Sequence, residues 1–186
     1  MEDVHNVCSI RWQIPIYLLQ CVLELGFARS PKSRYHEAMN ASVTGWGYEG
    51  HSIEDLLEEC KRKHAKFVVD VRLNAISRKK GFSKTALSQA LDVAGVQYVH
   101  LRALGNPKDN RPGFARPGTP DAVRAHERFN TEVLDAPEAE EQLAMLADLA
   151  HRGNVILLCF EETPNCCHRH LVIERLRERE KTVTLV

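Results

Sequence analysis

The most reactive stretch of this sequence lies in its last third. A run of four aliphatic residues leads directly into Cys159 and Glu161. After a Pro-Asn turn signal come Cys167, His168 and Arg169, at the head of a helical pattern. The aliphatic run predicts a strand buried on both faces, and the spacing after it predicts a helix. Thiols, an imidazole and a guanidinium are therefore expected at a helix N-terminus, which attracts anions and lowers the pKa of a nearby thiol.

These side chain types suit thiol chemistry on an anionic substrate. Cys159 or Cys167 is the expected nucleophile, and His168 or Glu161 the expected proton carrier. Arg169 completes the expected catalytic cluster as a cation that binds the anion. The alternative for Cys159 is that it serves as a small apolar core residue, which is how most buried cysteines behave.

An aspartate in an apolar segment is the second unusual feature. Asp70 follows Phe-Val-Val, and its burial without a partner would cost several kcal/mol. Arg72 and Arg169 are the two candidate partners. We expect an Asp–Arg pair that either orients the catalytic groups or ties a strand to its loop.

The elements that position these residues alternate along the chain. The predicted strands cover residues 41–46, 66–71, 96–101, 154–160 and 182–186. The predicted helices cover residues 52–63, 83–94, 120–134, 137–152 and 165–181. This alternation predicts a three-layer, Rossmann-like α/β domain with a mainly parallel sheet of about five strands.

In such a sheet the carboxyl ends of the strands share one edge, where ligands bind. The expected substrate-binding residues at this edge are Tyr48, Glu49, Arg72, Arg78, His100 and Arg102. Residues 105–120 are rich in proline and glycine and lack periodicity, which predicts a long loop. With Lys108, Arg111 and Arg116, this loop is expected to close over a ligand.

Two other chemistries fit the spacing less well. A phosphatase-type loop needs a cysteine and an arginine separated by five residues, and none of Cys159, Cys166 and Cys167 meets this requirement. A zinc site could draw on Cys159, Cys167 and His168 or His170, but no Cys-x-x-Cys pair supports it. We therefore expect no cofactor, with zinc as the less favoured alternative.

Charge and composition limit the partners. The chain has 25 basic and 25 acidic residues, so a general affinity for nucleic acids is not implied. Residues 72–116 nevertheless carry nine basic residues against two acidic ones. The expected partner is an anionic small molecule or a nucleic acid, and the alternative to an enzyme is a non-catalytic module that binds such a ligand.

Residues 1–41 form a separate N-terminal extension to the domain at 42–186. Leu18, Leu19, Val22 and Leu23 suggest one amphipathic helix, which is a candidate contact for a homo-oligomer. The longest apolar stretch is interrupted by polar residues and is too short for a membrane span. The start does not resemble a secretory signal, so free thiols in the cytoplasm are expected.

Several motifs resemble the domain-of-unknown-function family 488. They are a glycine turn with an aromatic residue (Gly47–Gly50), an Asp-Val-Arg strand end (Asp70–Arg72) and a Tyr-x-His-Leu strand (Tyr98–Leu101). The last two are a Cys-x-Glu motif (Cys159–Glu161) and a Cys-His-Arg motif (Cys167–Arg169). Cys166 stands where members often have histidine. The resemblance covers about residues 42–186 and implies a single α/β domain in a prokaryotic cytoplasm, without implying a reaction.

Overall fold

A computed structural model describes residues 42–179 and 184–185 of the chain. The expected amphipathic helix and its oligomer contact lie outside these described residues.

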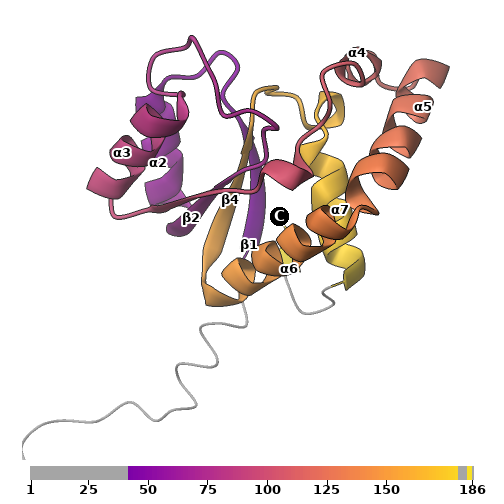
Figure 1. Cartoon of the computed structure of the whole chain (residues 1–186). Helices are drawn as coiled ribbons and strands as arrows, with labels where there is room; N and C mark the ends of the chain where they lie inside the picture. The colour runs from indigo at the N-terminus through magenta and orange to yellow at the C-terminus, as the bar shows by residue number, and fades with distance from the viewer. Residues whose placement is uncertain (1–41, 180–183, 186) are drawn as a thin grey trace, which may run out of the picture.

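A five-stranded parallel sheet forms the centre of the domain. Its order is β3-β2-β4-β1-β5, with bounds Gln97–His100, Ala65–Asp70, Asn154–Cys159, Ser42–Gly47 and Thr184–Leu185. The main helices are α2 (Ile53–Arg62), α3 (Lys84–Val93), α5 (Pro120–Arg128), α6 (Pro137–Arg152) and α7 (Arg169–Arg179). Figure 1 shows α2 and α3 on one face of the sheet and α6 and α7 on the other. The predicted three-layer α/β fold is confirmed.

The two central strands are buried on both faces. Residues Phe67–Asp70 of β2 and Val155–Cys159 of β4 are all buried. Alternate side chains enter the two hydrophobic cores, so Leu157 packs with the α6 and α7 side while Ile156 and Leu158 pack with the α2 and α3 side. This explains why the sequence there is a continuous apolar run rather than an alternating one.

Ser52 caps the N-terminus of α2. Ser52 Oγ accepts a hydrogen bond from the Asp55 backbone N–H at 3.2 Å, and Asp55 Oδ2 accepts one from the Ser52 N–H at 2.6 Å. This reciprocal pair satisfies two helix N–H groups that would otherwise lack partners. It fixes the chain just after the turn that carries Tyr48.

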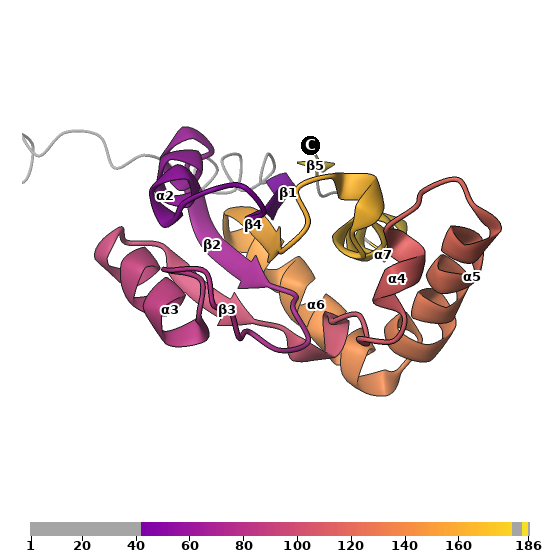
Figure 2. The same ribbon diagram turned by 90° about the horizontal axis from the view of Figure 1, so that it is seen from above.

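The predicted long loop is partly helical. Residues Arg111–Phe114 form α4, and buried Phe114 contacts Phe129 edge-on at 6.1 Å between ring centroids. The predicted helix at 120–134 is interrupted, because Phe129–Leu134 adopt a π-helical turn. Seen from above, α4 and α5 lie beside α7, away from α2 and α3 (Figure 2). The sequence missed α4 because one helical turn is too short to show periodicity.

The last helix begins later than the sequence indicates. Residues Pro164–Cys166 form a 3-10 turn, and α7 starts at Arg169 rather than at Asn165. The turn is closed by a hydrogen bond from the Cys167 N–H to the Pro164 carbonyl at 3.0 Å. Cys167 itself is extended, with φ −132° and ψ 138°. It therefore precedes α7 and is buried in the core on that side of the sheet.

The loop after β4 approaches the end of β1 very closely. A Cβ atom at Gly47 would overlap the Glu161 carbonyl oxygen. The Tyr48 N–H also donates to the Cys159 carbonyl at 3.2 Å. Glycine at position 47 thus allows the two strand ends to meet.

We expect Gly47→Ala to lower the free energy of unfolding by about 3 kcal/mol, because backbone must move to relieve the overlap. Gly118→Ala is the control: its methyl group would meet no atom within 4 Å, and only its φ of +79° is unfavourable. That change should cost about 1 kcal/mol. Urea denaturation measures both values, and equal effects would contradict the close approach at Gly47.

Candidate active site

A buried ion pair anchors the strand ends. Asp70 is fully buried at the end of β2, and Arg72 is 6% exposed. Arg72 Nε donates to Asp70 Oδ1 at 2.8 Å and Nη2 donates to Oδ2 at 2.6 Å. Tyr98 donates its hydroxyl to Oδ2 at 2.7 Å. Of the two partners that the sequence left open, Arg72 rather than Arg169 pairs with Asp70.

The rest of the Arg72 guanidinium contacts other segments. Nη1 donates to the Tyr48 hydroxyl and to the Phe82 carbonyl, both at 3.0 Å. Burial disfavours the charged form, yet the hydrogen bonds and charge of Asp70 raise the pKa of Arg72 above its usual value. His100 Nε2 lies 2.8 Å from the Arg72 carbonyl oxygen. Arg72 therefore joins β2, β3, the turn after β1 and the segment before α3.

Four reactive side chains meet beside this pair. Cys159, Glu161, Cys167 and His168 place one sulfur, oxygen or nitrogen atom each within 4.8 Å of the others. The Cys159 Sγ donates to Glu161 Oε2 at 3.2 Å. His168 Nδ1 lies 3.8 Å from the Cys159 sulfur and 3.9 Å from the Cys167 sulfur. The structure thus brings four of the six predicted catalytic residues into direct proximity.

The hydrogen bond on the far side of His168 fixes its tautomer. Nε2 lies 3.0 Å from the Val71 carbonyl oxygen. A carbonyl only accepts, so Nε2 carries the proton and Nδ1 of the neutral ring presents a lone pair. That lone pair belongs to the nitrogen beside the two thiols.

Burial and hydrogen bonding set the charge of the cluster. Burial raises the pKa of Cys167 far above its ordinary value, so its thiol is protonated at neutral pH. Burial also disfavours the Glu161 carboxylate, but a backbone N–H, both thiols and His168 outweigh it and lower its pKa. The cluster therefore combines a carboxylate with a buried thiol that keeps its proton.

Arg169 has a different environment from the one the sequence suggests. It is 2% exposed, and Nη2 donates to the Glu162 carbonyl at 2.6 Å. Nη1 donates to the Glu161 carbonyl. Arg169 therefore holds the loop after β4 against α7, and it does not line the pocket described next.

A pocket of about 290 Å³ opens over the cluster. It is lined by Tyr48, Arg72, Leu73, Asn74, Ile76, Ser77, Arg78, Arg111, Cys159, Phe160, Glu161 and His168. We call it the Cys159 pocket. Six of the predicted site residues line it: Tyr48, Arg72, Arg78, Cys159, Glu161 and His168. Cys167 belongs to the cluster but does not line the pocket.

The remaining predicted residues lie around the pocket. Asp70 and His100 contact Arg72, as described above, without lining the pocket. Glu49 is exposed and accepts a hydrogen bond from the Glu162 N–H at 3.3 Å. Arg102 is exposed in the 3-10 turn after β3 and does not line the pocket.

Sequence reasoning missed several pocket residues. Phe160 was assigned to a core strand, yet it is 44% exposed. Ile76 is 83% exposed on the loop after β2 and also lines the pocket. Arg111, by contrast, is on the loop that the sequence predicts to close over a ligand, and it lines the pocket from the start of α4. The sequence does carry a signal for both apolar residues. Phe160 immediately follows a strand, and Ile76 lies inside a basic loop.

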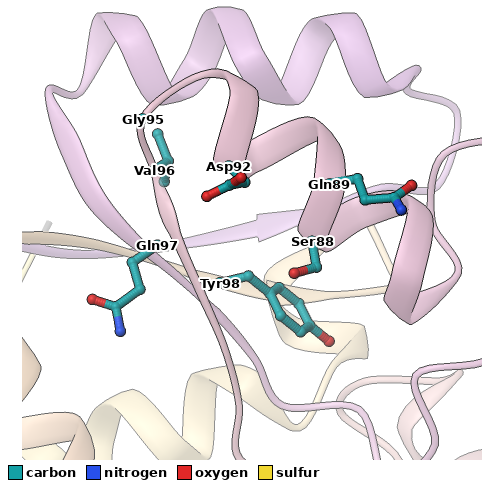
Figure 3. Close-up of a pocket in the computed structure, with 7 residues that line it drawn as sticks. All are labelled: Ser88, Gln89, Asp92, Gly95, Val96, Gln97 and Tyr98. Carbon is teal, nitrogen blue, oxygen red and sulfur yellow. The ribbon is translucent and has the colours of Figure 1, made fainter.

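A larger hollow of about 460 Å³ lies elsewhere, between α3 and β3 (Figure 3). Ser88, Gln89, Asp92, Gln97 and Tyr98 supply its polar side chains. It has one carboxylate and no cation, thiol or imidazole, so its lining suits neither an anionic ligand nor the predicted chemistry.

Comparison with protein families identifies the chain. The sequence model of the family described as "Domain of unknown function DUF488" matches residues 52–176. The chain belongs to this family. Ten of the twelve predicted site residues fall within the DUF488 match, and Tyr48 and Glu49 precede it. Searches of curated proteins and of solved structures find no match. Among the described residues, no helix has the length and apolar character needed to cross a membrane.

We expect Arg72→Ala to lower the free energy of unfolding by about 3–5 kcal/mol, because it leaves the buried Asp70 charge unpaired. Arg62→Ala is the matched control, since Arg62 pairs with Glu59 at 2.6 Å but is 65% exposed. Its loss should cost less than about 1 kcal/mol. Chemical denaturation of both variants tests this. Similar losses would mean that the buried pair does not anchor the domain.

The thiols should differ in reactivity. Burial raises the pKa of Cys60 to about 11 and raises that of Cys167 further, whereas Cys166 is partly exposed. At neutral pH we expect iodoacetamide to modify Cys166 at least about tenfold faster than Cys60 or Cys167, because thiolate and access are both required. Peptide mass spectrometry measures the rates. Cys167 reacting as fast as Cys166 would contradict the burial of its thiol.

Proposed function

We propose that this DUF488 protein is an enzyme that acts on an anionic substrate, such as a nucleotide or a nucleic acid end, in the Cys159 pocket. The observation that carries the proposal is the overlap of cations and reactive groups in one cavity. Arg78 and Arg111 line the same pocket as Cys159, Glu161 and His168. A pocket with convergent polar groups and perturbed pKa values is the usual form of an active site.

The cations that line the pocket favour an anion. Arg72 is neutralised by Asp70, so Arg78 and Arg111 supply the excess positive charge against Glu161. Arg78 is exposed and has no carboxylate partner among the residues that the structure describes. Arg111 uses Nε on the Asn106 carbonyl at 3.2 Å, which leaves its terminal nitrogens for a ligand. Guanidinium groups bind phosphate and carboxylate oxygens with charge-assisted hydrogen bonds.

The aromatic and apolar lining supports a ligand that also has a flat ring. Phe160 packs edge-on against Tyr48 at 5.2 Å between ring centroids, and part of its ring is exposed. Ile76 lines the same cavity. Bases stack on such exposed rings in single-stranded nucleic acids and nucleotides. This favours a nucleotide over a simple inorganic anion.

Three of the four clustered side chains, Cys159, Glu161 and His168, line the same cavity. Cys159 lines the pocket and Cys167 does not. A proton acceptor, His168 Nδ1, and a carboxylate, Glu161, both contact the Cys159 sulfur. A thiol, an imidazole and a carboxylate beside a bound anion support transferase or hydrolase chemistry on that anion.

Calorimetric titration with AMP tests the pocket. We expect Arg78→Ala and Arg111→Ala each to weaken binding by about tenfold or more, because each removes charge-assisted hydrogen bonds. Arg177→Ala is the control, since Arg177 is an exposed arginine of α7 outside the pocket. It should bind AMP as the unaltered protein does.

The same variants separate an enzyme from a binding module. If the protein is an enzyme, Cys159→Ser should abolish the conversion of nucleotides while changing the affinity for AMP little. Mass spectrometry measures the conversion. Loss of AMP binding in Arg177→Ala but not in Arg78→Ala would refute the location of the binding site in the Cys159 pocket. Unchanged conversion in Cys159→Ser would refute the assignment of the cluster.

A further inference from the structure

The Cys159 cluster has the donor atoms of a metal site. We propose that Cys159, Glu161, Cys167 and His168 bind one zinc ion. The inference rests on the proposed function in that it names the cofactor of the same pocket. With zinc bound, the Cys159 sulfur and His168 Nδ1 act as ligands, and the metal takes over from them the activation of the substrate. Two sulfurs, one imidazole nitrogen and one carboxylate oxygen lie within 4.8 Å of one another. Four-coordinate sites built from such ligands are the preference of zinc in proteins.

The two distances from His168 Nδ1 to the sulfurs fit zinc ligands better than they fit hydrogen bonds. Ligands that bind zinc at about 2.0–2.3 Å in a tetrahedron lie roughly 3.3–3.8 Å from one another. His168 Nδ1 is 3.8 Å from the Cys159 sulfur and 3.9 Å from the Cys167 sulfur. Two thiols thus face a single nitrogen lone pair, and both are long for a hydrogen bond to it. An ion at the centre would satisfy all three atoms at once.

The second shell of His168 is already in place. Its Nε2 proton is held by the Val71 carbonyl at 3.0 Å. Zinc-binding histidines typically donate their other ring N–H to a carbonyl or carboxylate, which fixes the ring and the coordinating tautomer. Here the hydrogen bond leaves Nδ1 as the ligand atom.

The choice of zinc follows from the donors and their burial. Cys159, Cys167 and His168 are all buried, at 4%, 1% and 5% exposure. Two thiolates and an imidazole select zinc over magnesium or calcium, which prefer oxygen. Binding replaces the two thiol protons, which pass to solvent, so the sulfurs bind as thiolates. Glu161 is already a carboxylate and loses no proton.

Glu161 occupies the position next to the substrate. It is the one partly exposed member of the four, and it lines the Cys159 pocket. The ligand at this position is therefore the one that water or substrate can replace. Zinc would then act as the Lewis acid that polarises the bound anion or its water, with both cysteines as ligands.

The sequence pointed away from zinc for a clear reason. The usual sequence signal for a zinc site is a Cys-x-x-Cys pair, whereas seven residues separate Cys159 from Cys167. Cys159 comes from the end of β4 and Cys167 from the extended residue before α7. The fold of the intervening loop, and not local spacing, brings the two sulfurs together.

Zinc and cobalt titrations of the full chain, with no nucleotide present, test the inference. We expect one Zn²⁺ per chain by elemental analysis, and a Co²⁺ adduct with intense thiolate charge-transfer absorption that zinc displaces. Cys167→Ser should weaken zinc binding by at least about 100-fold, more than the loss of a second-shell partner costs. Cys166→Ser is the matched control, since this neighbouring cysteine is outside the cluster, and it should bind zinc normally.

Each outcome supports or overturns the zinc site. Absence of bound zinc in the folded chain, a cobalt adduct without thiolate bands, or equal affinity in Cys167→Ser would overturn the proposal. A disulfide between Cys159 and Cys167 in chain that binds no zinc would overturn it as well. If Cys167→Ser does not fold, the cobalt spectrum of the unaltered chain decides between the two outcomes. If the chain binds AMP but no zinc, the proposed cofactor alone is wrong. If it binds zinc but no AMP, the proposed substrate is wrong.

Discussion

The buried pair of Asp70 and Arg72 is the interaction on which the rest of the site depends. Its charges are almost completely removed from water, so each needs the other and needs further hydrogen-bonding partners. Those partners are Tyr98 for the carboxylate, and Tyr48 and the Phe82 carbonyl for the guanidinium. Because they come from different strands and loops, satisfying one ion pair fixes the edge of the sheet.

The cluster of Cys159, Glu161, Cys167 and His168 is assembled by a second set of contacts on the same edge. Arg169 holds the carbonyls of Glu161 and Glu162, and Gly47 gives that loop room. His168 is bound to the Val71 carbonyl, one residue from the ion pair. Two arginines that the sequence suggested as anion binders therefore shape the backbone. The task of attracting the anion falls to Arg78 and Arg111 in our proposal.

The sequence predicted the layers and the edge because these follow from local periodicity and from parallel strand geometry. It did not decide between Arg72 and Arg169 as partners of Asp70, since both fall at the same edge and only their distances distinguish them. It assigned Phe160 to the core, because an aromatic residue at a strand end is usually buried. The donor set around His168 depends on a loop that replaces the expected start of a helix with a 3-10 turn, and single-sequence patterns do not specify such turns.

In our proposal the Cys159 pocket holds the anion beside the cluster of thiol, imidazole and carboxylate groups. A crystal structure grown with AMP tests it most directly. We expect phosphate oxygens within hydrogen-bonding distance of Arg78 or Arg111, with the nucleotide inside the pocket that Cys159 lines. AMP bound at the hollow between α3 and β3, or on the outer surface of α5, with the Cys159 pocket empty, would contradict it.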